Sequence, residues 1–364
     1  MGSGIATELI LSKYPVTLKE VDKKFLTAGI DRIKANLQSR IKKGNMTLKE
    51  LGENLSLLNG VLDYESFSDM DMVIEAVNLE KYCPRHCIFA SNTSTTINLK
   101  LICERTNSHD RIVGVHFFSP DHVMQLLEIV RTERTSSQVI VDLLNVGKKM
   151  KKTSIVVGNC TGFAINRMIY PYTQAALMLV EHGADIYQID QAVTKFGMPM
   201  GPFRMMDLVG FKVAIAGGNQ FIENFPERSY KSMLVSVKLE DNPGGETTSK
   251  GFYIYDNKGK AIPDPEVLNS IDKARSITGV ATDSEIMKLS DQDKASDLDV
   301  AAVMGMGFPA YRGGIIFWAD SLGSKYVCSK LEEWSNVYGA FFKALCVFSR
   351  KSFQGAIFGG RGAC

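Results

Sequence analysis

A carboxylate in the middle of an apolar run restricts the fold of this chain more than any other feature. Glu128 has two apolar residues on either side, in the sequence LLEIV. A charge buried in such a strand is costly unless another group pairs with it. His116 ends the preceding apolar run, Val113–Val115, and is the candidate partner. A histidine held by a buried carboxylate suits a general base, whereas a core histidine in a structural ion pair is the alternative.

Short apolar runs recur before this pair and indicate a buried, largely parallel sheet. We predict a strand at Met72–Val77, and a further run at Cys87–Ala90 leads into the sequence SNTST. Ser94, in that sequence, supplies a hydroxyl that can reach the same proton as His116. Only nine residues, Asn78–His86, separate the two runs. A parallel crossover usually needs ~10–12 residues or more, so this connection is predicted to lack a full helix or to be shortened.

The first residues show half of a dinucleotide-binding pattern. Gly2 and Gly4 open a predicted helix, and a predicted strand follows at Val16–Glu20. Such glycines let a pyrophosphate approach the helix N-terminus, while Glu20 would bind the ribose hydroxyls and repel a 2′-phosphate. The predicted cofactor is therefore NAD rather than NADP. The strand that normally precedes these glycines is missing from the sequence, and Gly-Ser-Gly also caps ordinary helices.

Two basic clusters end predicted helices. A helix over Asp22–Lys43 ends in Arg40-Ile-Lys-Lys, which suits either a solvated helix end or contact with a phosphorylated part of a substrate. A second helix, over Ser136–Lys152, ends in KKMKK, where cations are favourable. We interpret this second cluster as a solvated face rather than a ligand site. Further strands are predicted at Leu55–Leu58 and Ile155–Gly158.

From Thr161 onward the pattern becomes helical. Asn166 lies in an otherwise apolar helix, so its amide serves either an interhelix hydrogen bond or a substrate contact. Gly197–Arg204 (GMPMGPFR) is echoed by Gly305–Arg312 (GMGFPAYR), which indicates a duplicated helical unit. The predicted divisions are an α/β nucleotide-binding domain over 1–160, helical copies over 161–260 and 261–343, and a divergent tail over 344–364.

Composition argues against several classes of function. The 364 residues are 45% hydrophobic and 23% charged, and the formal net charge of +2 gives no case for binding nucleic acid or an anionic membrane. No apolar run reaches the ~18 residues of a membrane span, and no leader is evident. Seven scattered cysteines indicate reduced thiols. The cluster Cys83-Pro-Arg-His-Cys87 has no matching ligands elsewhere, so no metal site is predicted.

Five ordered motifs carry a resemblance to a known family. SNTST, GVHFFSP, LLEIVR, GFAINRM and GMPMGPFRMMDLVG together resemble the L-3-hydroxyacyl-CoA dehydrogenases, in particular the dehydrogenase half of plant peroxisomal (glyoxysomal) fatty-acid β-oxidation multifunctional proteins. The resemblance runs from Met1 to about Phe342. It implies an α/β fold, with a Rossmann-like NAD-binding domain that lacks its first strand here, followed by an all-helical, internally duplicated C-terminal domain.

The resemblance also implies catalytic roles. His116 matches the family's general base and Glu128 its orienting carboxylate. Ser94 matches a hydroxyl that contacts both substrate and cofactor, and Asn166 matches a substrate contact. The implied reaction is the reversible, NAD-dependent oxidation of an L-3-hydroxyacyl-CoA to the 3-ketoacyl-CoA in fatty-acid β-oxidation.

Further positions match the family's binding residues. Gly2, Gly4 and Glu20 match NAD positions, and Asn36 and Lys43 fall where the family contacts the nucleotide end of coenzyme A. The partners expected are an acyl-CoA substrate and, through the helical domain, a second copy of the chain. Neither a nucleic acid nor a membrane is expected as a partner.

The sequence departs from the family's pattern in several places. The family's multifunctional proteins carry an enoyl-CoA hydratase/isomerase half upstream, the segment after MVIEAV is short, and a helical segment near Ser290–Lys294 is reduced. Residues 344–364 do not resemble the family and end without a Ser-Lys-Leu-type peroxisomal tripeptide. The expected location is therefore the peroxisome or glyoxysome by resemblance, with the cytoplasm as the alternative.

Two other functions stay open. One is an NAD-dependent dehydrogenase of a different hydroxy acid with the same two-domain plan. The other is a catalytically impaired, truncated fragment that acts only as a binding or assembly module, because the absent first strand would lie beside the cofactor. Comparing the activity towards hydroxyacyl-CoA with that towards free hydroxy acids distinguishes the first alternative from the hydroxyacyl-CoA dehydrogenase. Titration with NAD distinguishes the second, because an intact site should bind the cofactor.

Overall fold

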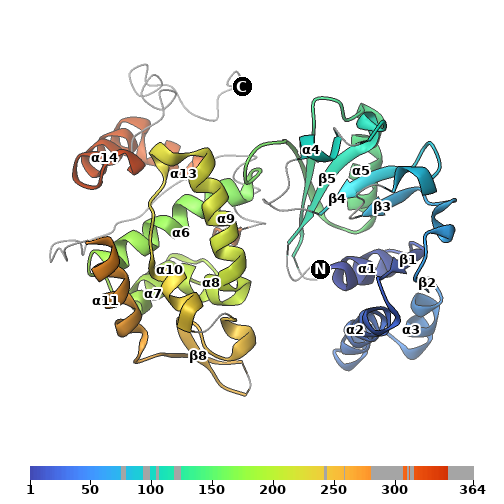
Figure 1. Ribbon diagram of the computed structural model, residues 1–364, viewed down its shortest axis with the longest axis horizontal. Coiled ribbons are helices and arrows are strands. Elements are labelled where there is room, and N and C mark those ends of the chain that lie inside the picture. Colours follow the sequence, from blue (N-terminus) through green and yellow to red (C-terminus); the bar gives the residue numbers. More distant parts are fainter. Residues whose placement is uncertain are drawn as a thin grey trace. The chain divides into compact units, whose positions relative to one another are not determined.

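The computed structural model describes residues 1–74, 79–92, 99–103, 106–118, 124–241, 244–257, 259–279, 306–309, 311 and 315–342. The chain divides into two compact units, Met1–Phe163 and Ala164–Cys364, which Figure 1 colours from blue to green and from green to red. Ser94 and the last three residues of the strand predicted at Met72–Val77 lie outside the described residues.

The first unit alternates helices and strands. Its elements are α1 (Gly2–Leu11), β1 (Val16–Lys19), α2 (Lys23–Lys42), α3 (Leu48–Leu55), β2 (Leu58–Val61), β3 (Met72–Ile74), β4 (Ile88–Ser91), α4 (Leu99–Cys103), β5 (Ile112–Phe117), β6 (Leu126–Arg131), α5 (Ser137–Lys149) and β7 (Thr153–Gly158). Five strands form a sheet in the order β3-β4-β5-β6-β7. Only the β5·β6 pair is antiparallel. This arrangement confirms the predicted α/β, Rossmann-like class.

The remaining two strands form a sheet of their own. β1 pairs in parallel with β2, from Val16 opposite Leu58 to Lys19 opposite Val61. Among the described residues, no ladder of hydrogen bonds joins β1 to β3. Each of these strands therefore keeps one edge without a strand partner in the described part of the chain.

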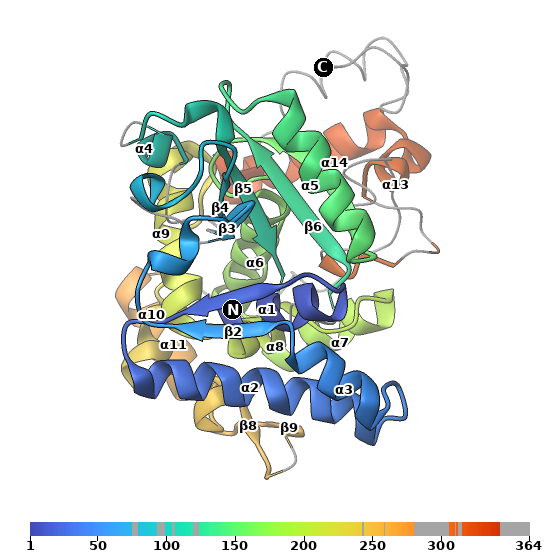
Figure 2. The same ribbon diagram turned by 90° about the vertical axis from the view of Figure 1, so that its right-hand side faces the viewer.

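Helix α1 holds the two sheets in one unit. Its Ile5 belongs to the core on the five-stranded sheet, which α5 also covers, and Ile5 is 4% exposed. Its Ala6 and Ile10 belong to a second core with Ile33 and Leu37 of α2. Figure 2 shows α5 across β6 and α1 beside β1 and β2. Because α1 contributes neighbouring faces to two cores, it packs on both sheets at once.

One sequence prediction in this unit was wrong. A strand was predicted at Leu55–Leu58, but Leu55 ends α3 and the strand starts only at Leu58. The sequence held a signal for that helix: the Thr47 hydroxyl accepts a hydrogen bond from the Glu50 amide, and the Glu50 carboxylate accepts one from the Thr47 amide at 2.7 Å. This reciprocal capping pattern marks a helix start and was overlooked.

The sequence predicts that the connection from β3 to β4 lacks a full helix or is shortened. Its described part, residues 79–87, contains a single 3-10 turn at Glu80–Tyr82 and no α-helix. The Glu80 side chain accepts hydrogen bonds from the amide of Asn107, at 3.0 Å, and from the hydroxyl of Ser108. These bonds lower the pKa of Glu80. The connection is therefore fixed by a carboxylate that bonds the loop before β5.

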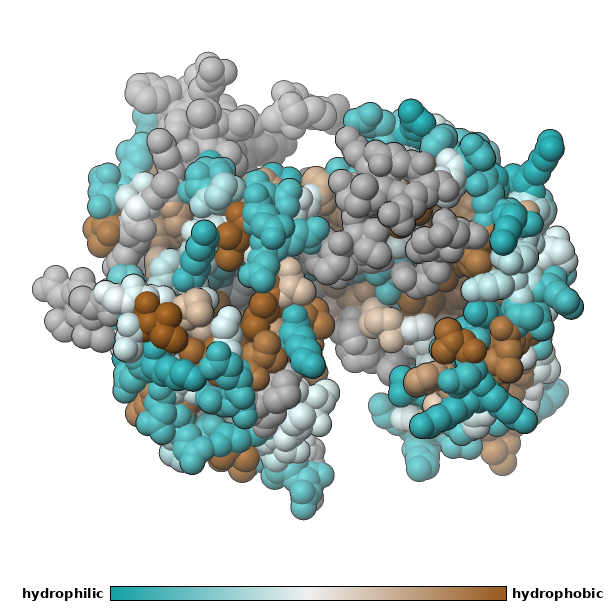
Figure 3. All heavy atoms as spheres, in the orientation of Figure 1, coloured by the Kyte–Doolittle hydropathy of each residue, from teal (hydrophilic) through white to brown (hydrophobic). Residues whose placement is uncertain are grey.

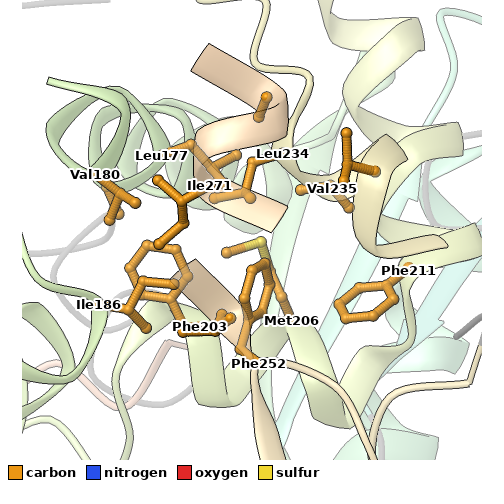
Figure 4. Close-up of a cluster of buried hydrophobic side chains, with 14 residues drawn as sticks. Leu177, Val180, Ile186, Phe203, Met206, Phe211, Leu234, Val235, Phe252 and Ile271 are labelled. Carbon is orange, nitrogen blue, oxygen red and sulfur yellow. The ribbon is translucent and has the colours of Figure 1, made fainter. Parts of the chain in front are cut away.

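The second unit is mainly helical. Its described elements are α6 (Ile165–Glu181), α7 (Ile186–Phe196), α8 (Pro202–Val209), α9 (Phe211–Asn224), α10 (Leu234–Asp241), β8 (Tyr253–Tyr255), β9 (Ala261–Pro263), α11 (Val267–Thr278), α13 (Ile315–Leu322) and α14 (Ser324–Tyr338). The antiparallel hairpin of β8 and β9 is an addition that the sequence patterns did not predict. Aromatic and aliphatic side chains from its helices meet in one core, shown in Figure 4.

Two buried aspartates organise this core. Asp190 of α7 accepts hydrogen bonds from the amides of Phe203 and Arg204, at 3.0 and 2.9 Å, and so caps α8. Asp207 of α8 accepts hydrogen bonds from the amides of Phe252 and Tyr253, at 2.8 and 3.0 Å. Burial raises the pKa of both carboxyl groups. Both aspartates therefore satisfy backbone donors that would otherwise be buried without partners.

The predicted sequence echo brings its two segments into contact. The Tyr311 hydroxyl donates a hydrogen bond to the Phe196 carbonyl at 2.7 Å. Gly197 lies against Pro309, and Gly307 lies against Pro199, so that a side chain at either glycine would collide with a proline. Both glycines also have positive φ angles, of 117° and 71°. Residues 280–305, 310, 312–314 and 343 of the second copy lie outside the described residues, so the duplication itself stays a prediction.

Among the described residues, no helix is both long and apolar enough to cross a bilayer. The face drawn in Figure 3 carries hydrophilic residues over much of its described surface, with hydrophobic residues between them.

Candidate functional site

The centre of the site is one cross-strand pair. In the antiparallel ladder of β5 and β6, His116 lies directly opposite Glu128. The Nδ1 atom of His116 and the Oε2 atom of Glu128 are 2.6 Å apart, and the two residues are 6% and 0% exposed. A carboxylate oxygen can only accept, so Nδ1 carries the proton and the other ring nitrogen, Nε2, is left as a base. The sequence predicted this pairing from the cost of a lone buried charge.

Strand alternation places the pair on one face of the sheet. Val115 and Phe117 point into the core that α1 and α5 cover, so His116 points to the opposite face. There its ring lies against Phe118, with ring centroids 4.4 Å apart, and against Phe163 at 5.9 Å. These aromatic neighbours limit the access of water to the imidazole and hold its ring plane.

Asn92 is a positioning residue that the sequence patterns did not reveal. It directly follows β4, and its Oδ1 accepts a hydrogen bond from the Phe117 amide at 2.9 Å. This bond ties the end of β4 to the end of β5, next to His116. The available signal was a polar residue immediately after a buried strand, at the edge where parallel strands carry functional groups. Ser94, two residues further on, lies outside the described residues.

The predicted cofactor residues lie at one end of α1 and β1. Gly2 and Gly4 form the first turn of α1, and no hydrogen-bond acceptor among the described residues faces the amides of Gly2 and Ser3. A methyl group added at Gly2 would meet no atom of the described residues within 4 Å. Glu20 follows β1 and is half-buried. Free amides at a helix N-terminus and a carboxylate beyond the next strand fit the pyrophosphate and ribose of a dinucleotide.

Packing brings these two parts of the predicted cofactor site together. A Cβ atom at Gly29 of α2 would lie 3.1 Å from Leu18 of β1 and 3.7 Å from the Ser3 hydroxyl of α1. The lack of a side chain at Gly29 therefore lets α2 pack closely against both elements. This packing holds the start of α1 near the end of β1, where Glu20 lies.

The two residues assigned to the nucleotide end of coenzyme A are placed differently. The Asn36 amide donates a hydrogen bond to the Thr7 hydroxyl at 3.1 Å, so it helps to join α2 to α1. Lys43 follows α2 as its exposed C-cap. No described contact joins either of them to His116. Asn166 lies in the first turn of α6, in the other unit, and is half-buried.

The cysteine cluster does not resemble a metal site. Among the described residues, no group of three His, Cys, Asp or Glu side chains could hold a metal ion. Burial raises the pKa of the Cys87 thiol to about 12 and also raises that of Cys83. Thiols with raised pKa values are poor sources of the thiolate that zinc requires.

Comparison with known protein families shows which family has these two domains. Residues 1–160 match the domain described as "3-hydroxyacyl-CoA dehydrogenase, NAD binding domain". Residues 162–255 match "3-hydroxyacyl-CoA dehydrogenase, C-terminal domain". The chain belongs to the 3-hydroxyacyl-CoA dehydrogenase family. Its first unit is therefore the family's NAD-binding domain, and the buried histidine–glutamate pair lies within that domain.

Similar curated proteins come from plants. The glyoxysomal fatty acid beta-oxidation multifunctional protein MFP-a of Brassica napus is 61% identical over 391 residues, covering 98% of this chain and 54% of the relative. The peroxisomal fatty acid beta-oxidation multifunctional protein MFP2 of Arabidopsis thaliana is 60% identical, with the same two coverages. The chain thus spans about half the length of the curated relatives it matches.

Solved structures support the fold. The crystal structure of M. tuberculosis FadB2 is 31% identical, covers 70% of this chain and 95% of its own, and superimposes with a TM-score of 0.68. The 3-hydroxybutyryl-CoA dehydrogenase of Escherichia coli covers 98% of this chain and 96% of its own, with a TM-score of 0.80. At 20% identity, the second likeness is evidence of the fold alone.

Proposed function

We propose that this chain catalyses the reversible oxidation of an L-3-hydroxyacyl-CoA to the 3-ketoacyl-CoA with NAD. The observation that carries the proposal is the buried pair of His116 and Glu128, joined at 2.6 Å across β5 and β6. Membership of the family supplies the reaction class, and the pair supplies the base that this reaction needs.

His116 is the proposed general base. Its Nε2 takes the proton of the substrate's 3-hydroxyl group, while Glu128 keeps the imidazole in the required tautomer and stabilises the imidazolium that forms. NAD held by Gly2, Gly4 and Glu20 would supply the acceptor for the hydride from C3. Ser94 and Asn166 are proposed to contact the substrate at the reacting group, and Ser94 also the cofactor.

Gly2, Gly4 and Glu20 are the proposed cofactor residues. The free amides at the start of α1 suit the pyrophosphate, and the Glu20 carboxylate suits the ribose hydroxyls. A 2′-phosphate at the same place would be repelled by Glu20, so the site should prefer NAD to NADP. Asn36 and Lys43 on α2 are proposed to contact the nucleotide end of coenzyme A, although Asn36 also bonds Thr7.

The experiment that tests the proposal measures formation of NADH from purified chain. L-3-hydroxybutyryl-CoA should be oxidised, and free L-3-hydroxybutyrate should not be a comparable substrate. Comparable turnover of the free acid would instead favour a dehydrogenase of another hydroxy acid. The His116→Gln variant is the matched control, since its amide can still donate to Glu128 but cannot act as a base.

The wider setting is also proposed from the relatives. Their names place them in fatty-acid β-oxidation in glyoxysomes or peroxisomes, and we propose the same pathway and location for this chain. Self-association through the helical unit is a further proposal. Sedimentation of the purified chain across a range of concentrations would test it.

A binding or assembly module is the second candidate function. The observation that favours it is the separation of β1 and β2 from the five-stranded sheet among the described residues. Under this alternative, the edge that should support the cofactor is incomplete, and calorimetric titration would find weak NAD binding or none. Tight NAD binding together with turnover of the acyl-CoA would eliminate the alternative.

A further inference from the structure

Two basic clusters that are far apart in sequence line one pocket in the first unit. The pocket has a volume of about 370 Å³ and is lined by Arg40 of α2 and by Lys149, Lys151 and Lys152 at the end of α5. Among the described residues, Glu8 of α1 is the one carboxylate that lines the pocket, so the described lining carries four positive charges and one negative charge, a net charge of +3. The volume lies at the lower end of the ~300–1,000 Å³ usual for small-molecule sites.

The Arg40 guanidinium contains a donor without a partner. Its Nε atom is buried and makes no hydrogen bond within the described part of the chain. A buried N–H group left without an acceptor costs ~1–3 kcal/mol, so native structures rarely keep one without a reason. Arg40, Lys149 and Lys151 also form no ion pair with a described carboxylate. An anionic ligand would satisfy these groups.

The backbone at the end of α5 directs the lysines to this pocket at a conformational cost. Lys151 has a φ angle of +56°, in the left-handed region that usually holds glycine. The turn is closed by hydrogen bonds from the Lys151 amide to the Lys148 carbonyl, at 3.0 Å, and from the Lys152 amide to the Gly147 carbonyl, at 2.9 Å. Strained positions kept by a surrounding structure are common at ligand sites.

Other contacts hold two of the cations in place. The Lys152 ammonium donates a hydrogen bond to the Met124 carbonyl at 2.8 Å, and Lys149 lies 3.6 Å from the centre of the Tyr14 ring. The ring contact does not neutralise the charge of Lys149. The positive groups are thus positioned before any ligand arrives, which lowers the entropic cost of binding.

The pocket is separate from the dehydrogenase site. Lys152 lies near Phe117, whose side chain points to the α1 and α5 face of the sheet, whereas His116 points to the opposite face. The pocket also contacts Glu8, Leu11 and Ser12 in the last turns and C-cap of α1, while the proposed cofactor residues form its first turn. None of these cations is among the residues proposed to act in catalysis or to bind NAD or the acyl-CoA.

We propose that this pocket binds the diphosphate group of a small molecule. Several cations around one small cavity, with a planar guanidinium among them, match the charge and the acceptor oxygens of linked phosphates. The chemistry is shared by two sources: a free phosphorylated metabolite, and the diphosphate of an acyl-CoA. The site does not depend on the proposed dehydrogenase reaction.

Calorimetric titration of the full chain with sodium pyrophosphate, at constant ionic strength, tests the proposal. The double variant Lys149→Gln/Lys151→Gln changes two exposed lysines that line the pocket. We expect it to weaken pyrophosphate binding at least about tenfold, the effect of losing one to two charge-assisted contacts. Lys148→Gln is the matched control, because Lys148 is a neighbour on α5 that does not line the pocket, and its affinity should stay within about twofold of wild type.

A second measurement locates the bound anion. Pyrophosphate should slow hydrogen exchange in peptides that cover Lys148–Thr153, and Arg40→Gln should abolish that protection while Lys42→Gln should not. Coenzyme A that competes with pyrophosphate would identify an acyl-CoA as the source, and coenzyme A that does not compete would identify a separate metabolite. Pyrophosphate affinity that is unchanged in the double variant, or reduced equally by Lys148→Gln, would overturn the proposal.

Discussion

Removing His116 should expose how strongly this chain depends on the buried pair. In the unmodified chain, the imidazole of His116 lies 2.6 Å from the fully buried carboxylate of Glu128. The His116→Ala variant removes this partner. Breaking such a buried pair from one side costs ~3–5 kcal/mol, a large part of the ~5–15 kcal/mol that stabilises a typical domain. Adding Glu128→Gln to His116→Ala removes the uncompensated charge, so the double variant should recover ~1–3 kcal/mol of that loss.

The assay must report on the first unit. Both tryptophans, Trp318 and Trp334, lie in the second unit, so their fluorescence would follow the wrong part of the chain. Hydrogen exchange of peptides from β5 and β6 measures the local free energy of opening instead. Glu133→Gln is the matched control, because it makes the same chemical change at an exposed position just beyond β6 and should stay within ~0.5 kcal/mol of wild type.

The effects of changing His116 and Glu128 on kcat should not be additive. If Glu128 acts only through the imidazole, Glu128→Gln should lower kcat by about 10–100-fold in the wild-type background, since a hydrogen bond to a charged group contributes ~1.5–3 kcal/mol. His116→Gln should lower kcat by at least ~10²-fold, and adding Glu128→Gln to it should cause no further loss. Additive losses in kcat, or a double variant less stable than His116→Ala, would refute the coupled-pair reasoning.

Three further outcomes are expected. Glu20→Ala should narrow a preference for NAD over NADP that is at least ~10-fold in the unmodified chain, and initial rates with both cofactors check this. Gly114→Ala should lower the free energy of unfolding, measured by urea titration, by ~1–3 kcal/mol, because its methyl group would lie 2.8 Å from the Val130 Cβ. Gly158→Ala in β7 is the control: its methyl group meets no described atom within 4 Å, so its effect should be nearly neutral. The Asp207 carboxyl group should titrate above the ordinary aspartate value in carbon-13 NMR, since burial raises its pKa. The carboxyl group then holds its proton more tightly in the folded protein than in the unfolded one. Its contribution to the stability of the fold therefore falls as pH rises through the folded-state pKa.

The pairing of His116 with Glu128 could be predicted because the cost of a lone buried charge can be read from a short stretch of sequence. A glutamate inside LLEIV needs a partner, and His116 was the nearest polar group at the end of another apolar run. What the sequence did not contain was the strand direction. Antiparallel pairing of β5 and β6 within a mostly parallel sheet sets His116 opposite Glu128, and that register follows from the whole sheet rather than from either strand.

The errors also have physical causes. Leu55–Leu58 combines the last turn of an amphipathic helix with the first residue of a strand, and a short apolar run cannot separate the two. The assignment of Asn36 to the nucleotide end of coenzyme A is not such an error and stays a prediction; the structure adds that the Asn36 amide donates a hydrogen bond to Thr7 on a neighbouring helix. A sequence pattern does not reveal whether a polar side chain on a helix points to another helix or to a ligand.

The basic pocket shows the limit of reading charge clusters singly. The cluster that ends α2 and the cluster that ends α5 are about 110 residues apart, and each alone suits a solvated helix end. Only the packing of both helices around α1 places Arg40 beside Lys149 and Lys152. The interpretation of the α5 cluster as a solvated face was therefore made without knowing that Arg40 lines the same pocket.

The same helix explains how the first unit keeps its two functional edges together. β1 and β3 each leave an edge without a strand partner among the described residues, so the sheet does not transmit order from Glu20 to His116. Helix α1 does, because Ile5 packs on the five-stranded sheet while Ile10, which is 0% exposed, packs on α2 beside the smaller sheet. Two isoleucines of one helix thus replace the hydrogen-bond ladder as the link between the proposed cofactor edge and the proposed base.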